Sequence, residues 1–479
     1  MERKLRVMLV SSEAVPYAKT GGLADVAGSL PVALAELGAE VTLVLPFYRE
    51  VGMVEESAVP VRGQDAVVTY HEPPASLEAG VKTVLVRNDH YFWRDRLYGY
   101  TDEAERFVFF DRAVAELVRT NDWQPDVVHC NDWQTGLVPV YLRLLAEAEP
   151  RFARTRTLFT VHNLAFQGIF PEETMEVAGL PWDLFRVDGL EFYGQVNFLK
   201  AGLLFSDMVT TVSPTYAKEI QTPDFGERLD GVLRERADRL AGILNGIDTR
   251  VWNPGEDKYL PAVSARTPGS RKPAYKKALQ QKVGLPAAAA PVLGVVARLA
   301  RQKGFDLLCE ALPGLLEEKF QLVVLGVGEE DIQGRLEALA KEHPDRIKAL
   351  FRFDEHLAHL IYAGSDLFLM PSRYEPCGLG QMIALRYGSI PVVHATGGLA
   401  DTVQGFDAAT GEGNGFVFRE PTAEALAAAI REGLSAYKKE RVWADLVGKV
   451  VGIDHSWRKS AGQYLELYRR LMEEEPAKS

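Results

Sequence analysis

Short, continuously apolar runs rich in β-branched residues recur along the whole chain, and each is followed by a stretch with helical periodicity. The runs in the first half are LRVMLVSS, EVTLVLP, VKTVLV, PDVVHC and RTLFTVHN, and those in the second half are PVLGVVARL, KFQLVVLGVG, RIKALFRF, DLFLMPS and IPVVHA. Strands that are apolar throughout, without alternation, are typical of a parallel sheet covered by helices on both faces. The sequence therefore predicts α/β domains of the doubly wound, Rossmann-like kind.

The chain is too long for one ordinary core. It has 479 residues, and a single hydrophobic core stops growing at about 250–300 residues, so two domains are expected. Residues 245–261 (NGIDTRVWNPGEDKYLP) are rich in Gly, Pro, Asn and Asp, which indicates the start of a linker. A helix is expected at residues 272–282, before the second strand–helix series begins near Pro291. The last helical pattern, residues 457–472, is compatible with either domain.

Charge and cysteine content argue against several classes of protein. The formal net charge of −12 disfavours sequence-independent binding to nucleic acid or to an anionic membrane, because both need a positive surface. Cys130, Cys309 and Cys377 lie far apart without a C-x-x-C, so neither a disulfide scaffold nor a zinc site is indicated. The N-terminus lacks a signal-type apolar stretch, and no run has the length of a membrane span. We expect a cytoplasmic protein, and these features indicate no particular oligomeric state.

The hexapeptide TGGLAD occurs twice, at residues 20–25 and again at residues 396–401, each time after an apolar run and before a helical pattern. Paired glycines let backbone N–H groups approach an anion closely, and a helix N-terminus adds partial positive charge. Each copy is therefore a candidate phosphate cradle. The residues concerned are Lys19, Gly21 and Gly22 in the first copy and Thr396 and Gly397 in the second. A plain strand-to-helix turn is the alternative for each copy, and an ancestral duplication is an alternative origin of the repeat.

Further candidate ligands for an anion follow two runs of the second half. Arg298 and Lys303 flank a tight loop after PVLGVVARL, and this pair suits a diphosphate because Arg can fork over two oxygens while Lys acts as a point charge. Glu375 follows DLFLMPS, where its carboxylate can accept hydrogen bonds from sugar hydroxyls. The expected backbone donors of the same turn are Cys377, Gly378 and Leu379. Solvated surface charges are the alternative for the three ionic side chains.

Polar side chains also end the apolar runs of the first half, where a first domain would hold an acceptor or a sugar. Asp132 and Trp133 follow PDVVHC, and His162 ends RTLFTVHN. Asn245, at the end of the run LAGILNG, is expected either to reach the site or to cap the structure. His129 lies inside its run and is expected to be a hydrogen-bonded core residue. No D-x-D occurs in the chain, so no metal held by such a carboxylate pair is expected.

Together these motifs resemble the family of bacterial glycogen synthases and plant starch synthases. The resemblance rests on KTGGLADV, VVHCNDWQTGL, TVHNLAFQG, ILNGIDTRVWNP, RLARQKG, PSRYEPCGLGQ and TGGLADTV, which span nearly the whole chain in order. It implies the GT-B fold, with two Rossmann-like doubly wound domains facing a deep cleft. It also implies that the C-terminal helix crosses back to the first domain, so the expected domains are residues 1–244 plus 456–479 and residues 245–455.

The resemblance further implies a retaining transfer of glucose from ADP-glucose to the non-reducing end of an α-1,4-glucan (glycogen), without a cofactor. On the donor side it implies that Lys19 contacts the donor, Arg298 and Lys303 hold the diphosphate, Glu375 binds glucose hydroxyls and Phe353 stacks on adenine. On the sugar side it implies positions for His162 and Asn245 near the glucose 6-hydroxyl, for Asp132 beside the reacting sugar and for Tyr98 in the cleft.

Three departures from the family pattern alter the expected phosphate and base contacts. Gly380 replaces a hydroxyl residue, His394 with Ala395 replaces a pair that is often basic, and Phe353 stands where the family often has Tyr. No convincing nucleophile is evident, so same-face attack on the anomeric carbon is expected. The alternative functions are a GT-B enzyme that uses UDP-glucose or another nucleotide sugar, a glucan phosphorylase, a nicotinamide-dependent oxidoreductase and a non-catalytic glucan-binding protein.

Overall fold

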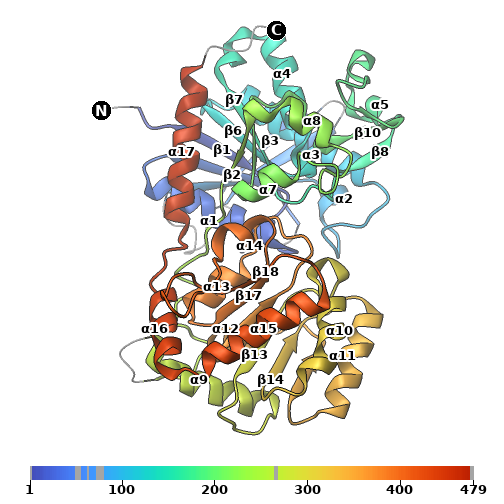
Figure 1. Cartoon of the computed structure of the whole chain (residues 1–479). Helices are drawn as coiled ribbons and strands as arrows, with labels where there is room; N and C mark the ends of the chain where they lie inside the picture. The colour runs from blue at the N-terminus through green and yellow to red at the C-terminus, as the bar shows by residue number, and fades with distance from the viewer. Residues whose placement is uncertain (1–2, 49–54, 62–63, 72–79, 264–267, 475–479) are drawn as a thin grey trace. The chain divides into compact units, whose positions relative to one another are not determined.

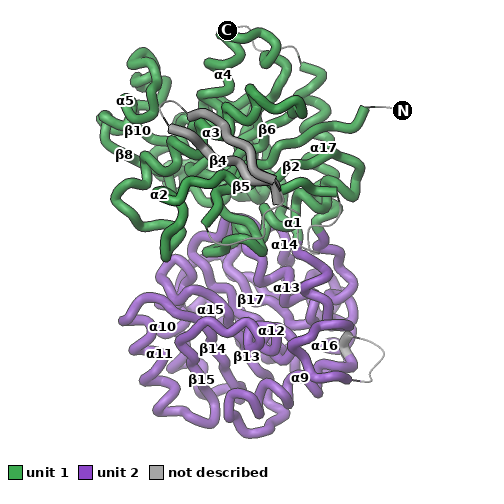
Figure 2. Tube along the Cα trace, turned by 180° about the vertical axis from the view of Figure 1, so that it is seen from behind, with its two compact units in different colours: residues 1–246, 457–479 green, residues 247–456 purple. Residues whose placement is uncertain are grey.

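The computed structural model describes residues 3–48, 55–61, 64–71, 80–263 and 268–474 (Figure 1). The chain folds into two compact units, coloured separately in Figure 2. Unit 1 comprises Met1–Gly246 and Trp457–Ser479, and unit 2 comprises Ile247–Ser456. The sequence analysis placed the two boundaries at residues 244 and 455.

Unit 1 is built on a sheet with the strand order β12-β11-β7-β6-β1-β2-β5-β4-β3. Its strands are β1 (Arg6–Val10), β2 (Glu40–Pro46), β3 (Glu55–Val61), β4 (Gln64–His71), β5 (Val81–Arg87), β6 (Val127–Asn131), β7 (Arg156–Val161), β11 (Met208–Thr211) and β12 (Leu240–Gly242). The strands from β12 to β5 are parallel, as predicted. The antiparallel edge formed by β4 and β3 was not predicted.

Helices cover this sheet, and two of them come from opposite ends of the chain. The longer helices are α1 (Gly22–Glu36), α3 (Glu103–Thr120), α4 (Val138–Ala148), α6 (Phe198–Phe205) and α17 (Trp457–Glu473). Leu30 of α1 and Tyr464 of α17 share one buried cluster, so the C-terminal helix is part of the core of unit 1 (Figure 1). His129 lies beneath α17, with its ring nitrogens 2.7 Å from the Tyr468 hydroxyl and 2.6 Å from Thr160 Oγ1. The prediction of a hydrogen-bonded core histidine is confirmed.

A small antiparallel sheet with the order β8-β10-β9 also belongs to unit 1. Its strands are β8 (Ile169–Pro171), β9 (Glu191–Phe192) and β10 (Gln195–Asn197). These strands have two or three residues each, which is too short for the apolar-run pattern to reveal them.

Unit 2 contains a sheet with the strand order β15-β14-β13-β16-β17-β18, in which every pair is parallel. Its strands are β13 (Val292–Val296), β14 (Gln321–Leu325), β15 (Ile347–Leu350), β16 (Leu367–Met370), β17 (Ile390–His394) and β18 (Phe416–Phe418). Its helices are α9 (Pro268–Val283), α10 (Phe305–Leu315), α11 (Glu330–Glu342), α12 (Glu355–Gly364), α13 (Gly380–Arg386), α14 (Gly397–Thr402), α15 (Ala423–Tyr437) and α16 (Glu440–Val450). The helix expected at residues 272–282 is therefore present as α9.

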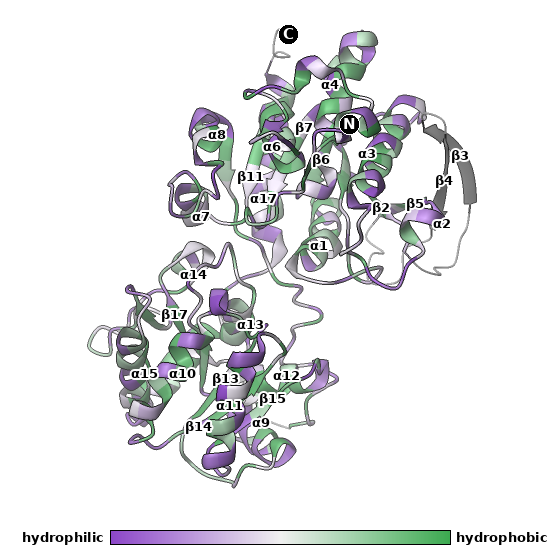
Figure 3. Cartoon of the chain, turned by 90° about the vertical axis from the view of Figure 1, so that its right-hand side faces the viewer, coloured by the Kyte–Doolittle hydropathy of each residue, from purple (hydrophilic) through white to green (hydrophobic). Residues whose placement is uncertain are grey.

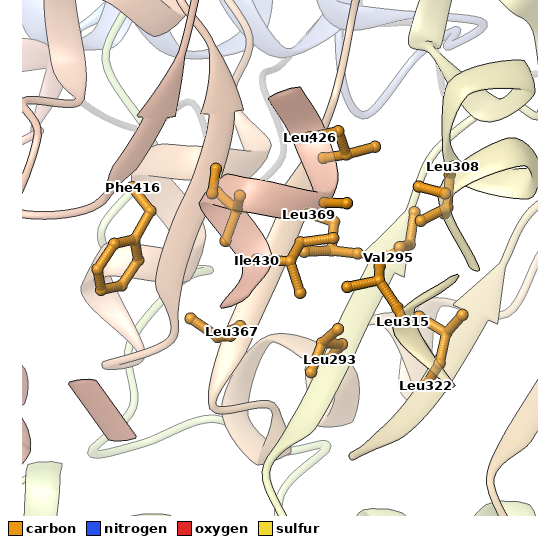
Figure 4. Close-up of a cluster of buried hydrophobic side chains, with 14 of the residues drawn as sticks. Leu293, Val295, Leu308, Leu315, Leu322, Leu367, Leu369, Phe416, Leu426 and Ile430 are labelled. Atoms are coloured by element: carbon orange, nitrogen blue, oxygen red, sulfur yellow. The ribbon is translucent and has the colours of Figure 1, made fainter. Parts of the chain in front are cut away.

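The hydrophobic core of unit 2 lies between the sheet and its helices. In Figure 3 the strands of unit 2 are coloured mainly as hydrophobic, whereas the surrounding helices also carry hydrophilic residues. Leu293, Val295 and Leu369 of the strands pack with Leu426 and Ile430 of α15 (Figure 4). Burial on both faces explains why these strands are apolar throughout.

Strand order determines where each unit can bind a ligand. In unit 1, β1 lies between β2 and β6, and in unit 2, β13 lies between β14 and β16. The connection after β1 runs to β2 and that after β6 runs to β7, on opposite sides of the β1–β6 pair. In the same way, the connections after β13 and β16 run to β14 and β17 on opposite sides. Each pair of connections therefore diverges and leaves a crevice at the carboxyl ends of the strands. The loops that follow β1 and β6, and those that follow β13 and β16, are therefore the places to look for function.

Candidate active site

In unit 2, the loops after β13 and β16 meet through an ion pair. Lys303 Nζ lies 2.5 Å from Glu375 Oε2, and both side chains are largely buried. The Ser372 hydroxyl donates to the same carboxylate over 2.9 Å. Two residues that the sequence placed on separate loops thus form one charged group at the crevice.

Arg298 is more exposed than this pair. Its guanidinium donates to Gln302 Oε1 over 3.3 Å, and Gln302 lies in the same loop, within the short 3₁₀ helix η6 (Arg301–Lys303). A weakly held guanidinium on the same loop as a fixed ammonium group is suited to binding an anionic ligand.

The two TGGLAD turns differ in their surroundings. At Gly397, which has φ +43°, an added Cβ would lie 2.0 Å from the Glu375 carbonyl oxygen, and at Gly398 it would lie 2.2 Å from that of Cys377. The second turn therefore packs directly on the backbone that carries Glu375, which explains its glycines. Among the described residues, an added Cβ at Gly21 or Gly22 would meet nothing within 4 Å, and no side chain caps the N-terminus of α1. The first turn is the open one.

Gln381 stabilises the turn of residues 375–379 through two hydrogen bonds. Its amide nitrogen donates to the carbonyl oxygens of Cys377 (3.1 Å) and Gly378 (2.9 Å). Cys377 is buried, and Leu379 is the residue before α13.

Phe353 projects from the loop between β15 and α12 and is 90% exposed. Exposure on that scale leaves a whole aromatic face for a ligand to cover.

In unit 1, Asp132 directly follows β6 in an unusual backbone conformation. Its φ of 56° with ψ of 179° is a combination that residues with a side chain rarely adopt, and such strain concentrates at functional sites. The backbone N–H of His162 donates to its carboxylate over 2.7 Å. Burial raises the pKa of Asp132 to about 7, and the nearby Glu13 carboxylate adds to the increase.

His162 follows β7 and lies beside Asp132. Burial lowers the pKa of His162 to about 3, so its ring is neutral at physiological pH. Its Nε2 lies 2.9 Å from Asn131 Oδ1, while Asn131 Nδ2 donates to the Val10 carbonyl oxygen over 3.0 Å. Since an amide oxygen only accepts, Nε2 carries the proton and Nδ1 is left as an acceptor.

Glu13 belongs to the same cluster and was missed by the sequence analysis. It follows β1, is 4% exposed, and accepts hydrogen bonds from the backbone N–H and the hydroxyl of Thr20. The Tyr98 hydroxyl lies 2.8 Å from Ser12 Oγ and 3.4 Å from Glu13 Oε1, and burial raises the pKa of Tyr98 well above its usual range. The rule that points to Asp132, a polar residue after an apolar strand, applies equally to Glu13 and would have found it.

Two other predicted residues of unit 1, Lys19 and Asn245, have different environments. Lys19 forms an exposed ion pair with Asp25, with 2.6 Å between Nζ and Oδ1. A pair of this kind contributes about 0–1 kcal/mol, so Lys19 is easily released to a ligand. Asn245 is buried beyond the end of β12, and its Oδ1 has no hydrogen-bond partner among the described residues, so no capping bond by this oxygen is seen.

Comparison with known proteins identifies the family to which this arrangement belongs. Residues 6–235 match the starch synthase catalytic domain, and residues 277–445 match the glycosyl transferases group 1. The chain is 46% identical to the glycogen synthase of Moorella thermoacetica, covering 100% of this chain and 99% of that protein. It is 45% identical to that of Desulforudis audaxviator, covering 98% and 97%. The chain belongs to the glycogen synthase family.

Solved structures agree with this assignment. The catalytic domain of starch synthase IV from Arabidopsis thaliana, bound to ADP and acarbose, is 36% identical, with a TM-score of 0.88 over 98% of this chain and 100% of that one. Sucrose-phosphate synthase from Thermosynechococcus elongatus, at 20% identity and a TM-score of 0.62 over 98% and 99%, shares the fold. The resemblance stated from the motifs and the GT-B fold are confirmed, and the protein is a glycosyltransferase.

Two departures from the family pattern have a structural explanation. A Cβ at Gly380 would lie 3.2 Å from Met370 Sδ and 3.3 Å from the Tyr362 hydroxyl, so neighbouring side chains fill the space that a larger residue would need. His394 is buried, with its ring nitrogens 2.8 Å and 2.9 Å from the carbonyl oxygens of Ser372 and Arg419. His394 therefore supports the strand end that precedes Glu375.

No group of three or more His, Cys, Asp or Glu side chains that could hold a metal ion occurs among the described residues. Within the same residues, none of the helices is both long and apolar enough to cross a membrane.

Proposed function

We propose that this member of the glycogen synthase family transfers glucose from ADP-glucose to the 4-hydroxyl at the non-reducing end of an α-1,4-glucan, with retention at the anomeric carbon. The observation that carries the proposal is the Lys303–Glu375 pair, with Arg298 on the same loop as Lys303, at the crevice of the unit 2 sheet. The relatives named glycogen synthase, and the related starch synthase bound to ADP and acarbose, support this choice of donor and acceptor.

The unit 2 residues act on the donor. When ADP leaves, negative charge develops on its β-phosphate, and Arg298 and Lys303 stabilise that charge as fixed cations. The ion pair with Glu375 holds the Lys303 ammonium in place before the donor binds. The second carboxylate oxygen of Glu375 accepts hydrogen bonds from glucose hydroxyls. Phe353 stacks on the adenine ring with its exposed face.

The unit 1 residues act on the sugars. His162 offers Nδ1 as an acceptor to a glucose hydroxyl, because its proton is on Nε2. With a pKa of about 7, Asp132 carries a full negative charge in only part of the molecules at neutral pH. A carboxyl group that is partly protonated is a poor nucleophile, which favours same-face attack. In that mechanism the acceptor hydroxyl forms the new C–O bond as the C–O bond to ADP breaks. The departing phosphate oxygen takes the proton of the acceptor.

The test is nucleotide release by the purified full-length protein. With glycogen as acceptor, we expect ADP release from ADP-glucose at a kcat/KM at least tenfold above that for UDP release from UDP-glucose. NMR of the product formed from labelled donor should show a new α-linked residue. Glycogen binding without nucleotide release would support the non-catalytic alternative, and preference for UDP-glucose would overturn the choice of donor.

A further inference from the structure

A cavity of about 450 Å³ lies in unit 1 at the amino ends of three strands of the large sheet. Arg156 begins β7, Asp207 directly precedes β11 and Arg239 directly precedes β12, and all three line the cavity. Asp132 and His162, in contrast, follow the carboxyl ends of β6 and β7. The six residues of β7 correspond to a length of about 20 Å between the two places. The volume is within the ~300–1,000 Å³ range usual for ligand sites, and no residue with a role in the proposed transfer step lines the cavity.

The ionic side chains of the lining carry more positive than negative charge. Four guanidinium groups face three carboxylates, in a chain whose formal net charge is −12. The basic residues are Arg143, Arg156, Arg236 and Arg239, and the acidic ones are Glu147, Asp207 and Glu474. A positively charged cavity in an acidic protein is suited to a small anion.

Arg236 uses few of its hydrogen-bond donors. A guanidinium has five N–H donors, but within the described residues only Nη2 of Arg236 is hydrogen-bonded, to the Ser206 carbonyl oxygen over 2.6 Å. Arg236 Nε and Ser206 Oγ are buried, and neither has a hydrogen-bond partner in that part of the chain. Burial lowers the pKa of Arg236, and the positive charges of Arg239 and Arg143 add to the decrease against the effect of two nearby carboxylates. A bound anion would offset this repulsion between guanidinium groups.

Arg143, on α4, is also available to a ligand. It is exposed, and among the described residues it forms neither a hydrogen bond nor an ion pair; its guanidinium carbon lies 5.6 Å from the centroid of the Phe205 ring. The other two arginines of the lining are held by Glu474, whose carbonyl and carboxylate oxygens accept hydrogen bonds from them. Arg143 and Arg236 are therefore the two guanidinium groups that can turn to a ligand.

The lining matches an anion that has an organic part. A phosphate monoester carries about two negative charges at neutral pH and three acceptor oxygens, which two guanidinium forks can share. The apolar side chains of the lining give an organic group a surface to cover, and its burial there is favourable. These side chains are Pro139, Leu142, Leu204 and Phe205.

We propose that this cavity binds a small organic phosphate, with Arg143 and Arg236 on the phosphate group and the apolar side chains on the organic part. The site is separate from the one at which Arg298 and Lys303 bind the diphosphate of the donor. The inference does not depend on which donor or acceptor the enzyme uses.

The experiment measures the binding of phenyl phosphate and of inorganic phosphate to the full-length protein by calorimetry. We expect phenyl phosphate to bind with a Kd of about 1 mM or lower, and inorganic phosphate to bind at least about threefold more weakly. Arg143→Ala and Arg236→Gln should each weaken the binding of phenyl phosphate at least about tenfold. Because Arg143 is exposed, Arg143→Ala should leave the Tm of the free protein unchanged, so that its loss of binding is no folding defect.

Two variants serve as controls. Arg186→Ala removes an exposed arginine of unit 1 that pairs with Asp188 and does not line the cavity, and it should bind phenyl phosphate as the wild-type protein does. Arg298→Ala removes a cation of the donor site and should also leave this binding unchanged.

The inference is overturned if the wild-type protein binds neither probe at about 10 mM, or if Arg143→Ala and Arg236→Gln both bind phenyl phosphate with wild-type affinity. Loss of binding in Arg298→Ala, with binding kept in Arg143→Ala, would place the probe at the candidate active site and would also overturn it. Equal affinities for phenyl phosphate and inorganic phosphate would overturn the assignment of an organic ligand.

Discussion

Replacing Asp132 by Asn tests whether the Asp132 carboxyl lowers the stability of the folded protein while serving its function. Burial raises the pKa of Asp132 from its ordinary value of 3.8 to about 7. The folded protein therefore binds this proton more tightly than the unfolded chain does. The resulting stabilisation is fully present below pH 3.8 and is lost as the pH rises through about 7.

The pKa difference corresponds to about 4 kcal/mol, since one pKa unit is worth about 1.4 kcal/mol. At pH 8 the wild-type protein carries an ionised, desolvated carboxylate, whereas the Asn side chain is neutral and keeps an oxygen to accept from the His162 N–H. Asn also tolerates positive φ better than most residues. We expect Asp132→Asn to raise the free energy of unfolding of unit 1 at pH 8 by up to about 4 kcal/mol.

The assay is differential scanning calorimetry at pH 8 and at pH 5, with the transitions of the two units resolved. For a domain of this size, the gain is equivalent to an increase in Tm of about 8–16 °C at pH 8, shrinking as the pH falls. Activity should fall at both pH values. Asp183→Asn is the control, because Asp183 is exposed and its replacement should leave the pH dependence of Tm unchanged. A Tm of Asp132→Asn at or below the wild-type value at pH 8 would refute the reasoning.

Three further outcomes are expected. Arg298→Ala should lower kcat by about 10²–10³-fold with an unchanged Tm, whereas Lys303→Ala should lower both, because it leaves the buried Glu375 carboxylate unpaired. Adding Glu375→Gln to Lys303→Ala should restore the Tm and not the activity, and a Tm that stays low would contradict the pairing argument. Phe353→Ala should raise KM for ADP-glucose without changing the Tm, and Phe353→Tyr should not raise it. Excess EDTA should leave kcat unchanged in a nucleotide-release assay.

Much of the fold follows from the sequence, because burial on both faces of a parallel sheet makes its strands apolar throughout. All ten runs identified from the sequence are strands in the structure. The edge formed by β3 and β4 and the small sheet of β8, β9 and β10 were not identified. Short or edge strands lack that continuous apolar signal, and their pairing partners are not encoded in their own residues.

The candidate site was predictable to the extent that it depends on position along a strand. Asp132, His162, Arg298 and Glu375 were all selected because they follow apolar runs, and each lies in a loop at the carboxyl end of a strand. Glu13 obeys the same rule and was overlooked.

The sequence by itself determined the types of elements, the residues at their ends and the family. Tertiary structure decided which loops adjoin, since strand order places β13 beside β16 and so joins Lys303 to Glu375, 72 positions away. It also made the two TGGLAD turns different, one packed on the Glu375 backbone and one open. Periodicity and propensity are properties of neighbours in the chain, whereas ion pairing, desolvation and close backbone approach depend on residues that only folding brings together.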